Sequence, residues 1–233
     1  MSIDPPGHFA RIRPSVKRIS RRRPMESAVR IENGVVIGTA GGKYDHTNPL
    51  ARYLIGQFDR AVSELAAHAA PSSVFEVGCG EGHVTKLLLE ATEAQILATD
   101  LSATVLAEAE EVLASDRVTY RPMDVMSLEQ MKPPPDLVVC CEVLEHLSDP
   151  RAALKRLLGQ RAKWYLLSVP REPIWRLLNM SRGAYLTEFG NSPGHCQHWN
   201  KRAFVRFIGQ AFKPVMVRTP LPWTVVLCRP HEA

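Results

Sequence analysis

Two kinds of apolar pattern alternate along this chain. Short runs rich in β-branched and other apolar residues lie at 73–77, 95–99, 136–141 and 164–169. Between them, apolar residues recur at the spacing that gives a helix one buried face. Strands that alternate with helices build a parallel sheet with helices on both of its faces. The chain is therefore predicted to fold into an α/β domain.

The remaining predicted elements complete that sheet. A shorter strand is expected at 117–120, and two closing strands at 215–219 and 224–228 are joined by a Pro-containing link that favours a hairpin. A helix is expected to begin after Asn48, an N-cap residue followed by proline, and to continue to about Ala70. We predict a Rossmann-like, seven-stranded, mostly parallel sheet with one antiparallel strand.

Basic residues are unevenly distributed along the chain. The 233 residues include 29 Lys and Arg against 24 Asp and Glu, a net charge of +5. Residues 1–30 hold eight of the basic and two of the acidic residues, so residues 31–233 hold 21 and 22 and carry a net charge of −1. We predict a disordered basic arm over 1–30 and a single domain over 31–233. The arm is interpreted as a solvated tail; contacts with phosphates or an anionic membrane, or translation from Met25, are the alternatives.

Composition also bounds the environment of the protein. The five cysteines form no CxxC pair, and Cys140 and Cys141 are adjacent in an apolar run. This is typical of buried thiols in a reducing compartment rather than of a disulfide framework or a zinc site. No apolar run approaches the roughly 18 residues that span a bilayer, and the N-terminus lacks the apolar stretch of a secretory signal. We predict a cytoplasmic protein.

A glycine-rich loop with the sequence EVGCGEG, residues 76–82, joins a predicted strand to a predicted helix. Glycine at such a turn allows unusual backbone angles and the close approach of a ligand. In the dinucleotide fingerprint G-x-G-x-x-G the third glycine would fall at position 83, where His83 stands; here it falls at Gly82. Glu76, two positions before the first glycine, suits a ligand with a cationic amino group and is a poor neighbour for a pyrophosphate.

The segment FEVGCGEG, residues 75–82, resembles the first motif, E/D-x-G-x-G-x-G, of class I S-adenosylmethionine-dependent methyltransferases. The resemblance extends from about Tyr44 to the C-terminus and implies a methyltransferase with S-adenosylmethionine as its cofactor. In that family the loop surrounds the methionine part of the cofactor, and an N-terminal segment closes over it. The resemblance places these residues at the cofactor: Tyr44, Glu76, Gly78, Cys79, Gly80, Gly82, Asp100, Leu101, Asp124, Val125 and Glu142.

Acidic residues after the next two strands extend the match. Asp100 ends the second strand, and a carboxylate at this family position accepts hydrogen bonds from the ribose hydroxyls, with Leu101 beside the adenine. Asp124, after the third strand, matches the acid that accepts from the adenine exocyclic amine; a turn-forming aspartate is the alternative. Ligands of open α/β sheets bind at strand ends, which is where these residues are expected.

The segment EVLEHL, residues 142–147, follows the fourth strand of the predicted sheet. It resembles a string found in the broad group that includes the ubiquinone-biosynthesis O-methyltransferases, where it borders the methyl donor. Methyl transfer from a sulfonium needs mainly placement of the nucleophile, and a base is required only for a hydroxyl of high pKa. His146 and Glu145 are our candidate catalytic residues, with His146 as the base; a packed helix-start histidine is the alternative.

The same string permits a metal-dependent hypothesis. Small-RNA 3′-terminal 2′-O-methyltransferases, which it also resembles, hold a divalent metal with such residues and a further histidine about fifty positions later. Here Glu142, Glu145, His146 and His195 would be the ligands. Because relatives without a metal share the string, our main prediction has no metal.

Residues 170–200 show no strong period and are interpreted as an insertion before a helix at 201–212. Aromatic and basic residues mixed in this insertion suit an anionic or amphipathic acceptor, whereas a lid that packs over the sheet is the alternative. We predict O-methylation of a small-molecule, lipid-linked or sugar-containing acceptor, with nucleic acid less favoured. Metal-dependent RNA 2′-O-methylation and a non-catalytic S-adenosylmethionine-binding role are the alternative functions.

Overall fold

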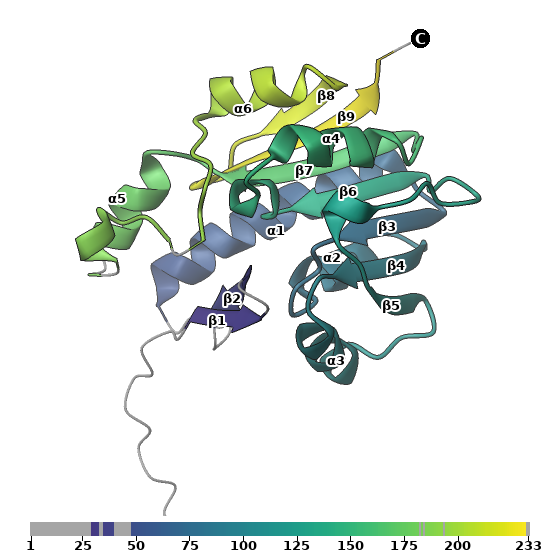
Figure 1. The fold of residues 1–233 in the computed structure, drawn as a ribbon, viewed down its shortest axis with the longest axis horizontal. Helices are drawn as coiled ribbons and strands as arrows, with labels where there is room; N and C mark the ends of the chain where they lie inside the picture. The colour runs from purple at the N-terminus through teal and green to yellow at the C-terminus, as the bar shows by residue number, and fades with distance from the viewer. Residues whose placement is uncertain are drawn as a thin grey trace, which may run out of the picture.

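A seven-stranded sheet forms the centre of the protein (Figure 1). The computed structural model describes residues 29–32, 35–39, 48–181, 183, 185–192 and 194–231. The strands of the sheet are β3 (Ser73–Val77), β4 (Gln95–Asp100), β5 (Val118–Pro122), β6 (Leu137–Cys141), β7 (Trp164–Pro170), β8 (Phe212–Arg218) and β9 (Trp223–Pro230). A separate antiparallel pair joins β1 (Val29–Glu32) to β2 (Val35–Thr39). The last two residues of the expected arm, Val29 and Arg30, therefore belong to a strand.

The order and direction of the strands confirm the predicted sheet. The order is β5-β4-β3-β6-β7-β9-β8, and β9 pairs antiparallel with both of its neighbours. The other pairs are parallel, so β9 is the one strand that runs against the rest. The order reverses between β3 and β6, and their carboxyl ends are therefore where an open α/β sheet receives a ligand.

Helices cover both faces of the sheet, as the alternating pattern predicts (Figure 1). They are α1 (Pro49–Ala69), α2 (His83–Ala91), α3 (Ala103–Val112), α4 (Pro150–Leu158), α5 (Ile174–Ser181) and α6 (Lys201–Ile208), with short 3₁₀ turns η1 (Val125–Ser127), η2 (Leu144–His146) and η3 (Leu186–Glu188). One buried cluster joins α1 and α2 to one face, and a second joins α4 and α6 to the other. The strand β6 is buried at all five positions because it lies between the two clusters.

Helix starts follow the capping residues that the sequence supplies. Asn48, Asp149 and Asn200 each accept a backbone N–H of the first turn at α1, α4 and α6 through the side chain. Such caps satisfy donors that have no partner within the helix. The expected start at Asn48 is thereby confirmed.

Two segments differ from the sequence-based expectation. The aperiodic insertion contains a helix, α5, and the helix expected to end at Phe212 ends at Ile208. At its end the Gly209 amide donates to the Val205 carbonyl, and Phe212 is already the first, fully buried residue of β8. Apolar residues close to a helix end fit either element, so tertiary packing decides between them.

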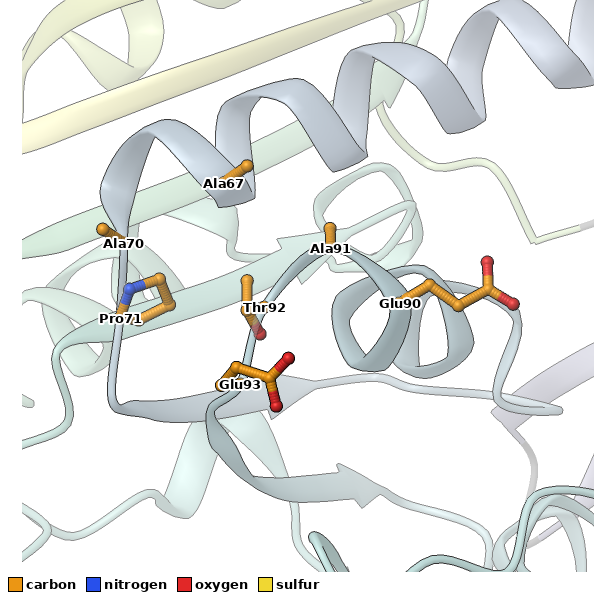
Figure 2. A pocket seen from close by; sticks show the side chains of 7 residues that line it. All are labelled: Ala67, Ala70, Pro71, Glu90, Ala91, Thr92 and Glu93. Carbon is orange, nitrogen blue, oxygen red and sulfur yellow. The ribbon is translucent and has the colours of Figure 1, made fainter.

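A shallow cavity of about 360 Å³ lies at the edge of the sheet opposite to the carboxyl ends of β3 and β6 (Figure 2). It lies where α1 and α2 end and the chain turns into β3 and β4, and it is lined by Ala67, Ala70, Pro71, Glu90, Ala91, Thr92 and Glu93. This edge is formed by the amino ends of the parallel strands, away from the glycine loop. Among the described residues, no helix has both the length and the apolar character needed to cross a bilayer.

Candidate active site

The glycine loop lies at the carboxyl edge of the sheet, between β3 and α2. The amides of Gly78 and Cys79 both donate to the Thr99 carbonyl, at 2.7 and 2.9 Å, which joins the loop to the end of β4. The Gly80 amide donates to the Asp100 carboxylate at 3.0 Å. The loop and the acid that follows the second strand therefore form one hydrogen-bonded unit, although 20 residues separate Gly80 from Asp100.

Glycine is required in this loop for two different reasons. Gly78 and Gly80 have φ angles of +76° and +54°, in the left-handed region that residues with a side chain rarely adopt. A Cβ on Gly78 would overlap the Val143 side chain, which follows β6, whereas a Cβ on Gly80 would meet nothing within 4 Å. The backbone at Gly80 thus faces open space, as expected of a loop that a ligand approaches closely.

Glu76 lies beneath the loop and is 2 % exposed. Its carboxylate accepts a hydrogen bond from the Thr85 hydroxyl at 2.7 Å. Burial raises the pKa of Glu76 to about 7; the Thr85 hydrogen bond opposes the rise and the nearby Asp100 charge adds to it. A carboxyl with a pKa near neutrality is sensitive to a cation placed beside it.

The Asp100 carboxylate ties the loop to the start of α3. One oxygen accepts the Gly80 amide and the other accepts the Ser102 amide, each at 3.0 Å. Since each carboxylate oxygen has two lone pairs, these bonds leave capacity for two hydroxyl donors. Leu101, next in the chain, is 47 % exposed at the same edge, where an apolar side chain can contact a nucleobase such as adenine.

The other expected cofactor residues have different surroundings. Asp124 is exposed and accepts the Met126 amide at 2.9 Å, so it does form the turn that was the alternative interpretation. Val125 is buried in the core cluster that contains α4. Cys79 is buried, and burial raises the pKa of its thiol well above the usual range. Tyr44 lies outside the described residues.

Glu142 faces the strands β7 and β9. The Trp223 indole N–H donates to one of its carboxylate oxygens at 2.9 Å, and the Ser168 hydroxyl donates to the other at 3.2 Å. Glu142 has a φ of +59° at the end of β6. Its place as a cofactor residue stays a prediction, and the structure does not group it with the histidines.

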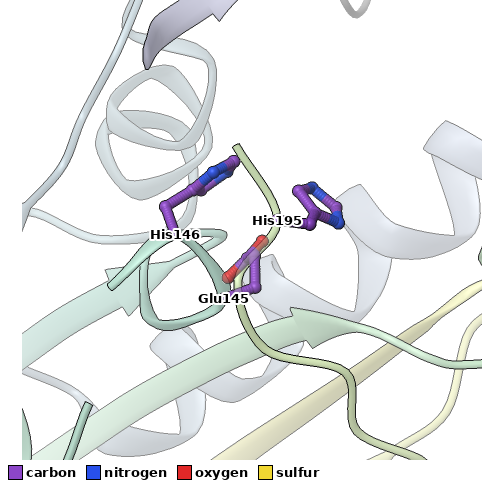
Figure 3. Close-up of side chains that lie close together, drawn as sticks. All are labelled: Glu145, His146 and His195. Atoms are coloured by element: carbon purple, nitrogen blue, oxygen red, sulfur yellow. The ribbon is translucent and has the colours of Figure 1, made fainter. Parts of the chain in front are cut away.

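Glu145 and His146 of η2 come together with His195 (Figure 3). One potential ligand atom from each lies within 4.8 Å of the others. The imidazole rings are 4.8 Å apart between centroids and nearly perpendicular, at 80°. Glu145 is 1 % exposed and His195 is 8 % exposed.

Backbone bonds hold the two parts of this cluster together. The amides of Cys196 and Gln197 donate to the Glu145 carbonyl at 2.7 and 2.9 Å. His146 Nδ1 lies 3.0 Å from the Gly194 carbonyl oxygen. A carbonyl only accepts, so Nδ1 carries the proton and the lone pair of the neutral imidazole is on Nε2.

Sequence reasoning found most of the polar residues at this edge but missed several that hold them. Thr85 lies in the first turn of α2 between Val84 and Lys86, and nothing in this local sequence marks its bond to Glu76. Trp175 and Trp223 contact each other at 5.7 Å between ring centroids, although 48 positions separate them. Trp175 is among the aromatic and basic residues of the insertion that were expected to suit an acceptor, whereas no pattern in the sequence marked Trp223 or its contact with Trp175.

Comparisons with known proteins agree with this architecture. Residues 75–160 match the family model described as "Methyltransferase domain". The chain is 38% identical over 133 residues to trans-aconitate 2-methyltransferase of Methylobacterium nodulans, covering 53% of this chain and 50% of that protein. It is 35% identical over 130 residues to ubiquinone biosynthesis O-methyltransferase of Methylococcus capsulatus, covering 48% and 53%. The chain thus spans about half the length of these two curated relatives.

Solved structures support the fold over a longer stretch. Magnesium protoporphyrin IX methyltransferase of Synechocystis PCC 6803, solved with bound SAH, superposes with a TM-score of 0.59. The match covers 81% of this chain and 90% of that one at 18% identity. At this identity the similarity establishes the Rossmann-like fold alone.

Proposed function

Since the chain belongs to the class I S-adenosylmethionine-dependent methyltransferases, we propose that it methylates an oxygen of a small-molecule, lipid-linked or sugar-containing acceptor. The observation that carries the proposal is the orientation of His146. Its Nδ1–H donates to the Gly194 carbonyl, so the lone pair of the neutral ring is on Nε2, and Nε2 is the nitrogen that can take up a proton. An acceptor hydroxyl needs such a base, whereas a thiolate or a neutral amine does not.

Residues of this chain fit two groups of the expected cofactor. Asp100 suits the ribose hydroxyls and Glu76 suits the amino group, while Gly80 leaves the backbone between them open to close approach. When bound, the sulfonium supplies an activated methyl group for in-line displacement. The chain then has to hold the acceptor oxygen on the far side of that methyl group and take up its proton at His146 Nε2.

Names of the relatives favour an oxygen acceptor on a small molecule. One is named for ubiquinone biosynthesis and O-methylation, and the other for trans-aconitate. The insertion contributes His195 and Trp175 to this side of the molecule. We infer that these residues select the acceptor.

The proposal is tested in two steps. Calorimetric titration with S-adenosylmethionine tests the cofactor, and no binding at millimolar concentration would refute it. Transfer of a tritiated methyl group into cell extract, fractionated into RNA, lipid and small molecules, then identifies the acceptor class. Label in the lipid or small-molecule fraction supports the proposal, and label only in RNA contradicts it. Binding without any transfer would favour the non-catalytic alternative.

Substitution separates the role of His146 from that of an ordinary histidine. His146→Ala should lose transfer by about a hundredfold while its affinity for S-adenosylmethionine stays unchanged. His198→Ala is the matched control, because His198 is an exposed histidine on the segment that carries His195, and its Nε2 hydrogen-bonds the Asn191 side chain at 2.8 Å. Full activity of His146→Ala would remove the proposed base.

A metal-dependent RNA 2′-O-methyltransferase is the second candidate function. It is favoured by the cluster of Glu145, His146 and His195, since two imidazoles and a carboxylate suit a divalent transition metal. The Nδ1–H bond of His146 to a backbone carbonyl is also the support that metal-bound histidines usually have. Metal analysis of the purified protein and transfer into RNA that a chelator abolishes would favour this candidate. Activity that survives chelation would exclude it.

A further inference from the structure

His195 lies on a loop, yet its imidazole is held in one place. The described residues between η3 and α6 form no helix or named strand, and only Trp199 makes a bridge, to Arg171. The bonds from the Cys196 and Gln197 amides to the Glu145 carbonyl fix the position of its backbone beside η2. Backbone bonds leave the side-chain torsions of His195 undetermined, so contacts of the ring itself must set its orientation.

The ring of His195 packs against Trp175. The two ring centroids are 6.1 Å apart and the planes are within 25° of parallel, which is a stacked arrangement. His195 also meets His146 edge-on. With 8 % of its surface exposed, the His195 imidazole is enclosed by these neighbours, and the flat face of Trp175 defines the plane in which it lies.

Trp175 is itself fixed at both its polar and its apolar parts. Its indole N–H donates to the Ser192 hydroxyl at 2.9 Å. The amide of the buried Asn179 side chain donates to that hydroxyl at 3.2 Å and to the Gly190 carbonyl at 2.8 Å. These bonds join α5 to the loop that carries His195, so the ring of Trp175 cannot turn without breaking them.

Trp223 connects this arrangement to the sheet. Its ring meets Trp175 edge-on at 5.7 Å and Phe58 of α1 at 4.9 Å. Its indole N–H donates to Glu142 at 2.9 Å, and only 4 % of Trp223 is exposed. A continuous series of ring contacts therefore runs from the core at Phe58 to His195.

We propose that Trp175 and Trp223 are positioning residues that orient His195 against His146 and so set the geometry of the acceptor side. The inference rests on the proposed function, because His146 is the base only in that function. It assigns the Glu142 carboxylate a role as the anchor of Trp223. An insertion that only packed over the sheet would not require the ring of Trp175 to stack on the ring of His195.

The test combines a spectroscopic signature with methyl transfer. In protein labelled with ¹⁵N-histidine, the ring signals of His195 should carry the upfield shift of a stacked indole. Trp175→Leu should abolish that shift and lower methyl transfer into the labelled extract fraction by about tenfold or more at saturating S-adenosylmethionine. The affinity for S-adenosylmethionine should be unchanged. Trp175→Phe keeps an aromatic ring but loses the N–H donor to Ser192, so it should fall between the wild-type protein and Trp175→Leu in both properties.

Two further variants keep the test decisive. Ser192→Ala removes the acceptor of the Trp175 indole N–H without changing any ring, and it should move the His195 signals even if Trp175→Leu does not fold. Trp199→Leu is the matched control, because Trp199 stacks on Phe207 of α6 instead. It should leave the His195 signals in place whatever it costs in stability.

The results distinguish a failure of the positioning role from a failure of the proposed function on which it rests. Unchanged His195 signals in both Trp175→Leu and Ser192→Ala would overturn the positioning role, as would wild-type transfer by Trp175→Leu. If the wild-type protein transfers no methyl group, the proposed function fails, and the histidine signals still decide whether Trp175 orients His195.

Discussion

Glu76 is the residue whose ionisation should respond most strongly to the cofactor. With a pKa near 7 in the ligand-free protein, it is largely protonated at pH 6, and a cationic amino group beside it favours the ionised form. The affinity for S-adenosylmethionine should therefore rise about fivefold from pH 6 to pH 7. Calorimetry in two buffers of different ionisation enthalpy should also detect proton release at pH 6. The range stops at pH 7 because an α-amino group itself loses its proton near 8.

Glu76→Gln is the control for this assignment. It keeps the shape and an oxygen for the Thr85 hydroxyl but has no proton to lose. Its affinity should be weaker and nearly constant between pH 6 and pH 7. The same pH dependence in the variant would assign the titration to another group.

The raised pKa of Glu76 also predicts how the stability of the ligand-free protein depends on pH. In the unfolded chain the carboxyl ionises near its ordinary value of 4.5, whereas in the folded protein it ionises near 7. The unfolded state therefore binds fewer protons between these values, and stability falls as the pH rises. Urea unfolding of the wild-type protein should lose about 2 kcal/mol between pH 5 and pH 7 relative to Glu76→Gln. Parallel profiles for the two proteins would contradict the assignment.

Gly78 and Gly80 allow backbone strain to be separated from steric overlap. Both need a left-handed backbone, so alanine at either position should cost about 1 kcal/mol. Only at Gly78 does the new methyl group overlap Val143, which should add about 2 kcal/mol. Urea unfolding without ligand should therefore rank Gly78→Ala well below Gly80→Ala. Equal losses would mean that the segment after β6 moves aside freely.

At the scale of elements, the sequence predicted the sheet well and the insertion poorly. Buried strands such as β6 are continuous apolar runs, and this local pattern can be recognised without knowing which helices pack on them. The helix α5 is different because its apolar residues face several partners at once, among them His195 and Trp223 for Trp175. Pro173, just before Ile174, was a helix-start signal that the weak periodicity concealed.

The helix α5 gives a prediction of its own. The buried Asn179 side chain bonds Gly190 and Ser192, so it fastens the end of the insertion to α5. Asn179→Ala should speed amide exchange over residues 185–192 by about tenfold and leave β6 and β7 unchanged. Ser181→Ala is the control, since that hydroxyl bonds only the Leu178 carbonyl among the side-chain bonds described. Equal acceleration in the sheet would mean that the insertion does not open as a separate unit.

For the whole molecule, the sequence could predict those parts of the candidate site whose positions depend only on the order and direction of the strands. Parallel strands deliver Glu76, Asp100 and His146 to one edge, so their positions follow from the strand assignments. The direction in which a side chain points at that edge does not follow from the strand assignments. Glu142 has the sequence spacing expected of a metal ligand beside Glu145 and His146. Its left-handed backbone and its bonds to β7 and β9 nevertheless direct its carboxylate away from the histidines. Those bonds depend on distant strands, which no local pattern records.

The same topology predicts how the cofactor should affect the stability of the chain. The expected cofactor residues follow β3, β4, β5 and β6, so a ligand there contacts both halves of the sheet. At a hundredfold excess over its Kd, S-adenosylmethionine should stabilise the folded state by about 2.7 kcal/mol. Because we propose that residues 31–233 form a single domain, differential scanning calorimetry should show one transition that moves up by roughly 5–10 °C. Asp100→Asn should reduce that shift. A second transition that the ligand leaves in place would show that part of the chain folds independently of the cofactor site.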